Sequence, residues 1–366
     1  MTWPIFILVS IIKVLLVFFI VMTAAAYTVW LERKLIGRMQ NRWGPTRVGP
    51  FGLLQPMADG IKFILKEDLT PPYVHKTLFV LAPMIALVPA LLPISLVPVG
   101  NTITVGGVTT PLQVTGTVLN GVPVDINIAL LLILGITSVG VYGIALAGWS
   151  SNSKYALLGS LRASAQMISY EVSLGISLVG VLLIANSLSL REIVNQQSGS
   201  WFPNVAWLSW IPRWNIFPQI IAFFTYVTAA YAETNRIPFD LPEAETELVA
   251  GYHTEYSSMK FAIFFIAEYC NMFTVSCIAT ALFLGGWHAP LNIATPHFLP
   301  PIAQVLMPVF WFVLKVVAFI FVYIWIRGTL PRFRYDQLMS FGWKFLFPLA
   351  LANVVVTSFV VAYFAK

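Results

Sequence analysis

Charged residues are scarce in this sequence. Only 10% of its 366 residues are Asp, Glu, Lys or Arg, while 58% are hydrophobic; an ordinary soluble domain carries about 25% charged residues. A water-soluble core cannot bury so much apolar sequence, but a lipid bilayer can accommodate it. The net charge of +6 does not indicate nucleic acid binding, because the basic residues lie between apolar segments and form no runs interleaved with aromatic residues. We therefore expect an integral membrane protein.

Cysteine and histidine are also rare. Cys270 and Cys277 lie in one apolar segment, separated along a helix by about 10 Å, which is too far for a disulfide. Without a CxxC pair or a set of four cysteines, the chain should hold no iron–sulfur cluster of its own. No glycine-rich loop indicates a nucleotide site. No histidine pair lies within the spans to hold a haem, since all four lie in or near loops: His75, His253, His288 and His297.

Long apolar runs are abundant instead. Eight segments have roughly the length that a membrane-spanning helix needs. The fifth is short, because the Trp- and Pro-rich stretch before it, residues 201–214, is typical of a membrane interface. We predict an all-α polytopic protein with a single membrane domain over residues 1–366. The predicted spans are residues 5–30, 77–98, 125–147, 166–188, 216–233, 260–286, 304–326 and 344–364.

The basic residues predict the orientation of these spans. The loops at 31–76, 148–165, 234–260 and 327–344 would share one side and hold sixteen lysines and arginines, against three on the opposite side. Because lysine and arginine concentrate in cytoplasmic loops, the sequence places these loops in the cytoplasm and both termini on the periplasmic side. On that outer side, segment 99–124 carries an Asn-Gly turn signal between β-forming residues, which predicts a small hairpin.

The first cytoplasmic loop contains an amphipathic stretch from Leu53 to Lys66. Most of its large residues are apolar, while Asp59, Lys62 and Lys66 recur at helical spacing and form one polar face. This pattern predicts a helix lying at the membrane surface. The helix either anchors the loop, with Asp59 and Lys62 paired along it, or forms the polar wall of a site entered from the lipid.

The third cytoplasmic loop, residues 233–247, is rich in carboxylates. Asp240 and Glu243 fit a capping box, but capping does not account for Glu245, Glu247 and Glu255. These residues either form a solvated acidic face or a cluster of interacting carboxylates beside the membrane. Such a cluster has raised and coupled pKa values, and it can carry protons.

The last cytoplasmic loop holds three arginines within eight residues, Arg327, Arg332 and Arg334. They are either determinants of topology, or neutralise the acidic loop, or dock a partner subunit. The sequence leaves these three alternatives open.

Several ionisable residues fall inside the predicted spans, where a charge is costly unless it is paired or faces a polar interior. We favour a role in proton or charge relay over purely structural pairing. Tyr170 and Tyr269 each neighbour a glutamate and are candidate hydrogen-bond partners for it. The residues inside spans are Lys13, Glu171, Glu268 and Lys315, and Glu233 ends a fifth span.

Three runs of sequence resemble a known family. Residues 52–62, 233–247 and 331–337 are similar to the membrane subunit that forms the floor of the quinone site in respiratory complex I, the H-subunit family of NADH–quinone oxidoreductases. The resemblance covers the main cytoplasmic loops and the number of spans. It is specific, because the three motifs agree in order and lie on one side.

The resemblance implies a function. Quinone would enter from the bilayer into a chamber between this polypeptide and a peripheral arm, and an iron–sulfur cluster of a neighbouring polypeptide would reduce it. The chain would hold no redox centre, while NAD, FMN and iron–sulfur clusters would belong to partner subunits. Other partners would be small membrane subunits and antiporter-like subunits that translocate protons.

Site residues carry over by position. The resemblance places one set near the quinone entry and chamber: Arg33, Arg42, Asp59, Lys62, Arg236, Phe239 and Arg327. It assigns a second set to a proton or charge relay: Glu171, Glu233, Glu243, Glu245, Glu247 and Glu268. A homologous component of a membrane-bound hydrogenase or of a related quinone reductase is the nearest alternative. A stand-alone secondary transporter is less favoured, because the inverted repeats and paired broken helices common in transporters are not evident.

Overall fold

The computed structural model describes residues 3–100, 102–105, 108–113, 115, 117–119, 122–124, 126–201, 209–240, 249–290 and 301–364. Within them, seven helical segments are long and apolar enough to cross a membrane. The helix α7 (Ile220–Glu233) is also apolar but shorter, and it makes an eighth apolar segment. Each of the eight predicted spans overlaps one of these segments, so the predicted polytopic helical fold is confirmed. The seven are α1 (Trp3–Met39), α3 (Lys76–Leu91) with η2 (Leu92–Leu96), α4 (Ala129–Ser150), α5 (Lys154–Ala185), α9 (Ser258–Phe283), α10 (Pro301–Thr329), and α11 (Tyr335–Phe341) continued through a π-helical turn, η5 (Gly342–Leu346), into α12 (Phe347–Phe364).

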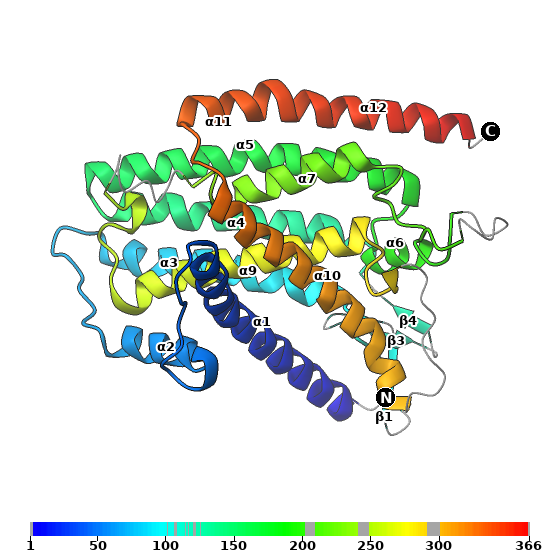
Figure 1. The fold of residues 1–366 in the computed structure, drawn as a ribbon, viewed down its shortest axis with the longest axis horizontal. Helices are drawn as coiled ribbons and strands as arrows, with labels where there is room; N and C mark the ends of the chain where they lie inside the picture. The colour runs from blue at the N-terminus through cyan, green and yellow to red at the C-terminus, as the bar shows by residue number, and fades with distance from the viewer. Residues whose placement is uncertain are drawn as a thin grey trace.

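The long helices form one bundle (Figure 1). Helices α3, α4, α5, α7 and α9 pack side by side, α12 lies along α5, and α1 and α10 cross the others obliquely. Helix α1 begins and α12 ends at the same end of the bundle, which agrees with an even number of crossings. We call this the terminal end, and the other the loop end.

Small residues let neighbouring helices approach closely. A Cβ atom on Gly143 of α4 would lie 2.7 Å from the backbone nitrogen of Ala86 in α3, and one on Gly159 of α5 would lie 2.7 Å from Gly251 Cα. Gly251 begins the short 3₁₀ turn η3 (Gly251–His253). Such contacts are typical of helix packing in membranes, where van der Waals contact replaces the hydrophobic effect. The outer faces of α1 and α12 are instead lined by exposed apolar side chains, such as Phe19 and Phe359.

The predicted amphipathic helix is confirmed as α2 (Gln55–Leu65), which follows the short turn η1 (Pro50–Gly52) at the loop end. Met57, Ile61 and Ile64 are all more than half exposed and recur at helical spacing. The end of α2 is fixed to the start of α9, because Ser258 Oγ donates to the carbonyl oxygens of Phe63 (2.9 Å) and Lys66 (3.0 Å).

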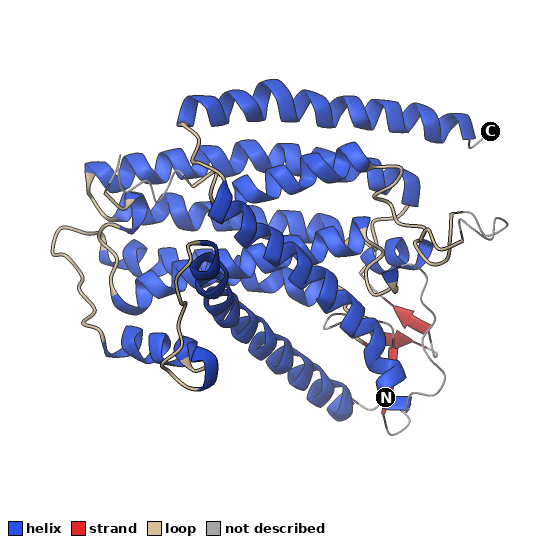
Figure 2. Ribbon diagram, viewed as in Figure 1, coloured by secondary structure: helices blue, strands red, loops and turns tan. Residues whose placement is uncertain are grey.

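Two small antiparallel hairpins lie at the terminal end (Figure 2). Strand β1 (Thr102–Val105) pairs with β2 (Val108–Pro111), and β3 (Thr117–Leu119) pairs with β4 (Val122–Val124). Leu119 is opposite Val122, on either side of the Asn-Gly signal, so the predicted hairpin is confirmed. The first hairpin was not predicted. Nearby, the short helix α6 (Leu190–Gln196) packs against α9.

Candidate functional site

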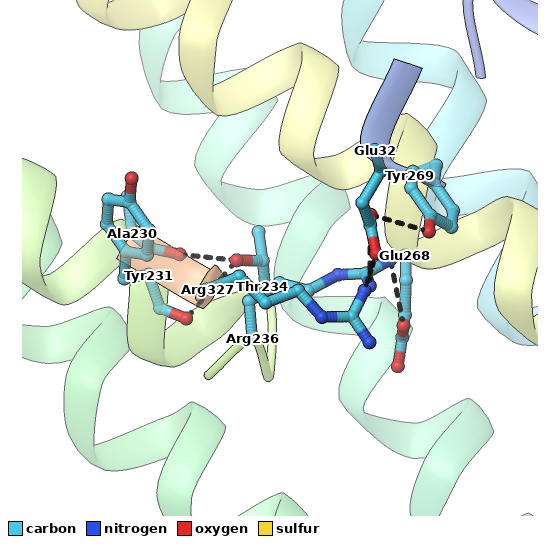
Figure 3. A network of polar contacts seen from close by, with 8 residues as sticks. All are labelled: Glu32, Ala230, Tyr231, Thr234, Arg236, Glu268, Tyr269 and Arg327. Atoms are coloured by element: carbon cyan, nitrogen blue, oxygen red, sulfur yellow. Dashed lines mark hydrogen bonds and ion pairs between the residues drawn. The ribbon is translucent and has the colours of Figure 1, made fainter. Parts of the chain in front are cut away.

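A network of charged groups, three of them buried, joins four segments of the chain near the loop end (Figure 3). Glu32 comes from α1, Arg236 from the turn after α7, Glu268 with Tyr269 from α9, and Arg327 from the end of α10. Glu32 and Glu268 are each 8% exposed and Arg236 is 5% exposed. Two acidic and two basic side chains therefore balance their charge within the protein.

Basic and acidic side chains alternate along the network. Arg327 Nη1 pairs with Glu32 Oε1. Arg236 lies between two carboxylates, with Nη1 3.9 Å from Glu32 Oε2 and Nη2 3.4 Å from Glu268 Oε2. Tyr269 Oη donates to Glu32 Oε2 over 2.9 Å, and its ring lies 4.1 Å from the Arg236 guanidinium carbon. A change in the charge of Glu32 therefore acts on both arginines, whereas a change in the charge of Glu268 acts directly on Arg236.

Arg236 is positioned by a tightly held turn. Helix α7 ends at Glu233, and Asn235 adopts a left-handed backbone conformation with φ of 50°, which asparagine tolerates better than most residues. The buried amide of Gln166 in α5 donates to Asn235 Oδ1 (3.2 Å), and to the carbonyl oxygens of Ala232 (2.8 Å) and Phe239 (2.7 Å). One side chain therefore fastens both ends of the turn that carries Arg236.

A small cavity lies beside the network, with Glu268 in its wall. Its volume is about 20 Å³, which is room for about one water molecule. Glu233, Glu268, Asn235 and Asn271 contribute polar groups to its wall. Glu233 Oε2 is buried with no hydrogen-bond partner among the residues that the structure describes, and Glu171 is close enough to Glu233 to interact electrostatically. Two predicted relay carboxylates thus line one cavity, and a third, Glu171, interacts with one of them.

A second group of predicted site residues surrounds an open hollow of about 660 Å³ at the loop end. Arg33 and Arg42 line it together with Arg47 and Gln55. Arg33 Nη1 pairs with Asp59 Oδ2 at 2.7 Å, and Gln55 Nε2 donates to Asp59 Oδ1 at 3.0 Å. These contacts tie α1 to the amphipathic helix. The hollow is basic, since three of its lining residues are arginines.

Comparison with known proteins identifies the family. A family model described as NADH dehydrogenase matches residues 12–358. A protein of Koribacter versatilis, named as an H subunit of NADH-quinone oxidoreductase, is 71% identical over 361 residues, covering 98% of each chain. The chain belongs to this H-subunit family. Relatives in Solibacter usitatus and Geobacter sulfurreducens, both named in the same way, are 50% and 51% identical and cover 99% and 96% of this chain and 98% and 94% of their own lengths.

The two groups of site residues both lie within the part of the chain that matches the family model. Arg236, Arg327 and Glu268 meet in the network. Arg33 and Arg42 line the hollow, and Asp59 pairs with Arg33. Lys62 is exposed on α2. Glu243, Glu245 and Glu247 lie outside the described residues. Within those residues, no three His, Cys, Asp or Glu side chains are grouped to hold a metal ion.

Phe239 has a packing role in this structure. Its side chain is 5% exposed and lies between the rings of Tyr170 and Phe333, with ring centroids 5.7 and 5.5 Å away. The next residue, Asp240, pairs with Arg332 at 3.0 Å, so at least one arginine of the last loop neutralises an acid of the third loop. This contact favours the second of the three alternatives for the arginine cluster.

Sequence reasoning missed Glu32 and assigned the tyrosines other partners. Glu32 is the one acidic residue in its run of sequence, directly before two basic residues at the end of a predicted span, and that position was a usable signal. Tyr269 donates to Glu32 rather than to its neighbour Glu268, and Tyr170 donates to the Leu338 carbonyl oxygen at 2.8 Å. Adjacent residues on a helix point in different directions, so sequence neighbours were poor candidates for pairing.

Proposed function

We propose that this chain is the membrane subunit of a proton-pumping NADH–quinone oxidoreductase in the bacterial inner membrane. It spans the membrane with eight helices, and both termini are periplasmic. The names of its relatives and the distribution of basic residues between the loops support this assignment. The electron donor chemistry, with NAD, FMN and iron–sulfur clusters, belongs to peripheral-arm partners.

In this proposal the loop end forms part of the quinone chamber. The single observation that carries it is the buried network in which Arg236 lies between Glu32 and Glu268. Reduction of a quinone to a quinol takes up two electrons and two protons and changes the charge nearby. Buried carboxylates that share one arginine have coupled protonation, so they respond to that change together. Arg33, Arg42, Asp59 and Lys62 belong to the entry of the chamber.

In this proposal, carboxylates carry the change in protonation from the quinone chamber into the membrane. Glu233 and Glu268 line one cavity, and Glu171 interacts with Glu233 from α5. A water molecule in that cavity would connect the two carboxylates, and ionisable groups inside a membrane commonly mark proton pathways. Glu243, Glu245 and Glu247 form the acidic loop that feeds this relay, which continues toward antiporter-like partners.

The experiment is purification of the native assembly in mild detergent, followed by an assay of NADH-driven reduction of a short-chain quinone and of proton pumping in liposomes. We expect Glu247→Gln and Glu268→Gln to assemble but to slow quinone reduction or its coupling. The exposed Glu67 supplies the control, and Glu67→Gln should be unaffected. Normal coupled turnover in both variants would remove the relay, whereas a lone chain that moves ions without partners would show a transporter instead.

A further inference from the structure

A buried lysine lies in the middle of α10, far from the ion-pair network. Lys315 is 7% exposed. Its Nζ donates to three backbone carbonyl oxygens, those of Leu284 (2.6 Å), Gly286 (2.9 Å) and His288 (2.7 Å). The ring of Trp214 lies 4.6 Å from Nζ. Lys315 therefore occupies a cage of oxygens and one aromatic face, all of which favour a cation.

The number of acceptors matches the charged form of lysine. An ammonium group has three N–H donors and no acceptor, so each of the three carbonyl oxygens receives one. A neutral amine has two N–H bonds and a lone pair, and that lone pair would face the third carbonyl oxygen. The three acceptors thus favour the ammonium form of Lys315.

The cage is built at the end of α9. The last carbonyl groups of a helix lack partners within it and carry partial negative charge, and here they are buried. Gln197 Nε2 donates to the Ala281 carbonyl oxygen (2.9 Å), Asn215 Nδ2 donates to that of Leu282 (3.0 Å), and Lys315 completes the set.

Two glycines shape the cage wall. Gly285 and Gly286 have φ of 69° and 52°, and a Cβ on Gly285 would lie 2.5 Å from Trp214 Nε1. Glycine adopts this left-handed conformation without strain, and it leaves room for the indole against the backbone. The carbonyls are therefore held in place around the ammonium by both the chain and its neighbours.

We propose that Lys315, held in its cage as an ammonium group, is a fixed cation that closes the terminal half of the bundle to protons. Arg327 lies twelve residues further along α10, about 18 Å away, so the cage lies well beyond the carboxylates of the network. A proton entering this half would approach a like charge in a medium of low dielectric constant, the means by which fixed positive charges exclude protons from membrane pores. The inference rests on the proposed function only in assuming a membrane that sustains a proton gradient.

The first test is Lys315→Arg in the purified assembly. A guanidinium keeps the positive charge and its donors and does not lose its proton in proteins. We expect Lys315→Arg to assemble and to keep quinone reduction and its coupled proton pumping within about twofold of the parent. Loss of assembly or of coupled turnover in this variant overturns the proposal, because it shows that a fixed positive charge alone does not meet the need at this position.

The second test is the passive proton permeability of liposomes containing the Lys315→Gln assembly. Glutamine retains two N–H donors without the charge. We expect permeability to rise about tenfold, the effect of one unit charge at about 10 Å with an effective dielectric constant of about 20. Lys13→Gln, which removes an ammonium that donates to the Gln113 carbonyl oxygen, is the control and should change little.

The outcomes separate cleanly. Unchanged permeability with Lys315→Gln overturns the proposal, and if that variant does not assemble, the result with Lys315→Arg decides. Passive leak is measured without quinone turnover, so a failure of the proposed quinone function would not imitate the permeability result; it would show as a parent assembly that does not reduce quinone.

Discussion

Tyr269 and Glu32 are hydrogen-bonded over 2.9 Å although 237 residues separate them in the sequence. The same tyrosine carries the Arg236 guanidinium on its ring face. One side chain of α9 therefore orients a carboxylate of α1 and an arginine of the turn after α7.

Replacing Tyr269 by Phe would remove the hydroxyl and keep the ring. Because a hydrogen bond to a charged group contributes about 1.5–3 kcal/mol, we expect Glu32 to lose its orientation while Arg236 stays over the ring. Quinone reduction per assembled complex should fall several-fold. Tyr142 of α4 is 66% exposed, so Tyr142→Phe is the matched control. Equal activity in the two variants would show that the Tyr269 hydroxyl has no role.

Removing one partner from the Glu32–Arg327 pair should destabilise the assembly more than removing both partners. A buried ion pair that loses one member leaves an uncompensated charge, at a cost of about 3–5 kcal/mol. We expect Arg327→Met and Glu32→Gln each to lower the temperature at which the purified assembly dissociates. The double variant should recover part of that loss. Strictly additive effects of the two substitutions would contradict coupling between the residues.

Asp59 allows function to be separated from stability. Its partner Arg33 has a side chain that is 48% exposed, and exposed ion pairs contribute only about 0–1 kcal/mol. We expect Asp59→Asn to leave assembly intact while slowing reduction of a long-chain, membrane-dissolved quinone more than that of a short-chain one. Asp68, which pairs with Lys260 at 3.0 Å, gives the control Asp68→Asn. The same loss with both quinones would argue against a role at the entry.

The burial of His253 leads us to expect that the stability of the protein depends on pH. It is 3% exposed and in contact with the rings of Tyr252, Phe261 and Phe264, and burial lowers its pKa from 6.5 to about 3. Because the folded pKa lies below the unfolded one, the unfolded chain takes up the proton first as pH falls. The stabilisation is complete above pH 6.5 and is lost progressively between pH 6.5 and 3, by at most about 1.4 kcal/mol per pH unit.

The measurement is the midpoint of thermal inactivation at pH 7 and pH 5. We expect a lower midpoint at pH 5 in the parent assembly and a smaller difference in His253→Phe, which keeps a ring among the surrounding aromatic residues. His75 is exposed, so His75→Gln should retain the full difference. A difference of the same size in His253→Phe would mean that other groups cause it.

The fold was largely predictable because its dominant signals are local. Eight apolar segments and the polar face of residues 53–66 follow from hydropathy and helical spacing alone, and all of them correspond to helices. The short α7 was also foreseen from the Trp-rich stretch before it. The oblique crossing of α1 and α10 was not predictable, since it depends on packing between helices that are far apart in the sequence.

Most residues of the site could be predicted from the sequence, but which of them pair with one another could not. The family resemblance supplied Arg236, Glu268 and Arg327, which the structure brings together. It did not supply Glu32 as their common partner, because which carboxylate an arginine meets depends on the relative placement of four segments. Lys315 shows the same limit. A charge in mid-span suggested relay, but its three carbonyl partners are backbone groups, and sequence patterns do not reveal them.

The ion pair between Glu32 and Arg327 joins residues 295 positions apart. Its two members are therefore made at opposite ends of synthesis on the ribosome. A nascent chain inserted only as far as α9 carries Glu32, Arg236 and Glu268 but lacks Arg327, the arginine that balances the second carboxylate. Emergence of α10 supplies Arg327 for the network and Lys315 for the cage at once, so neither arrangement can form before this one helix has been made.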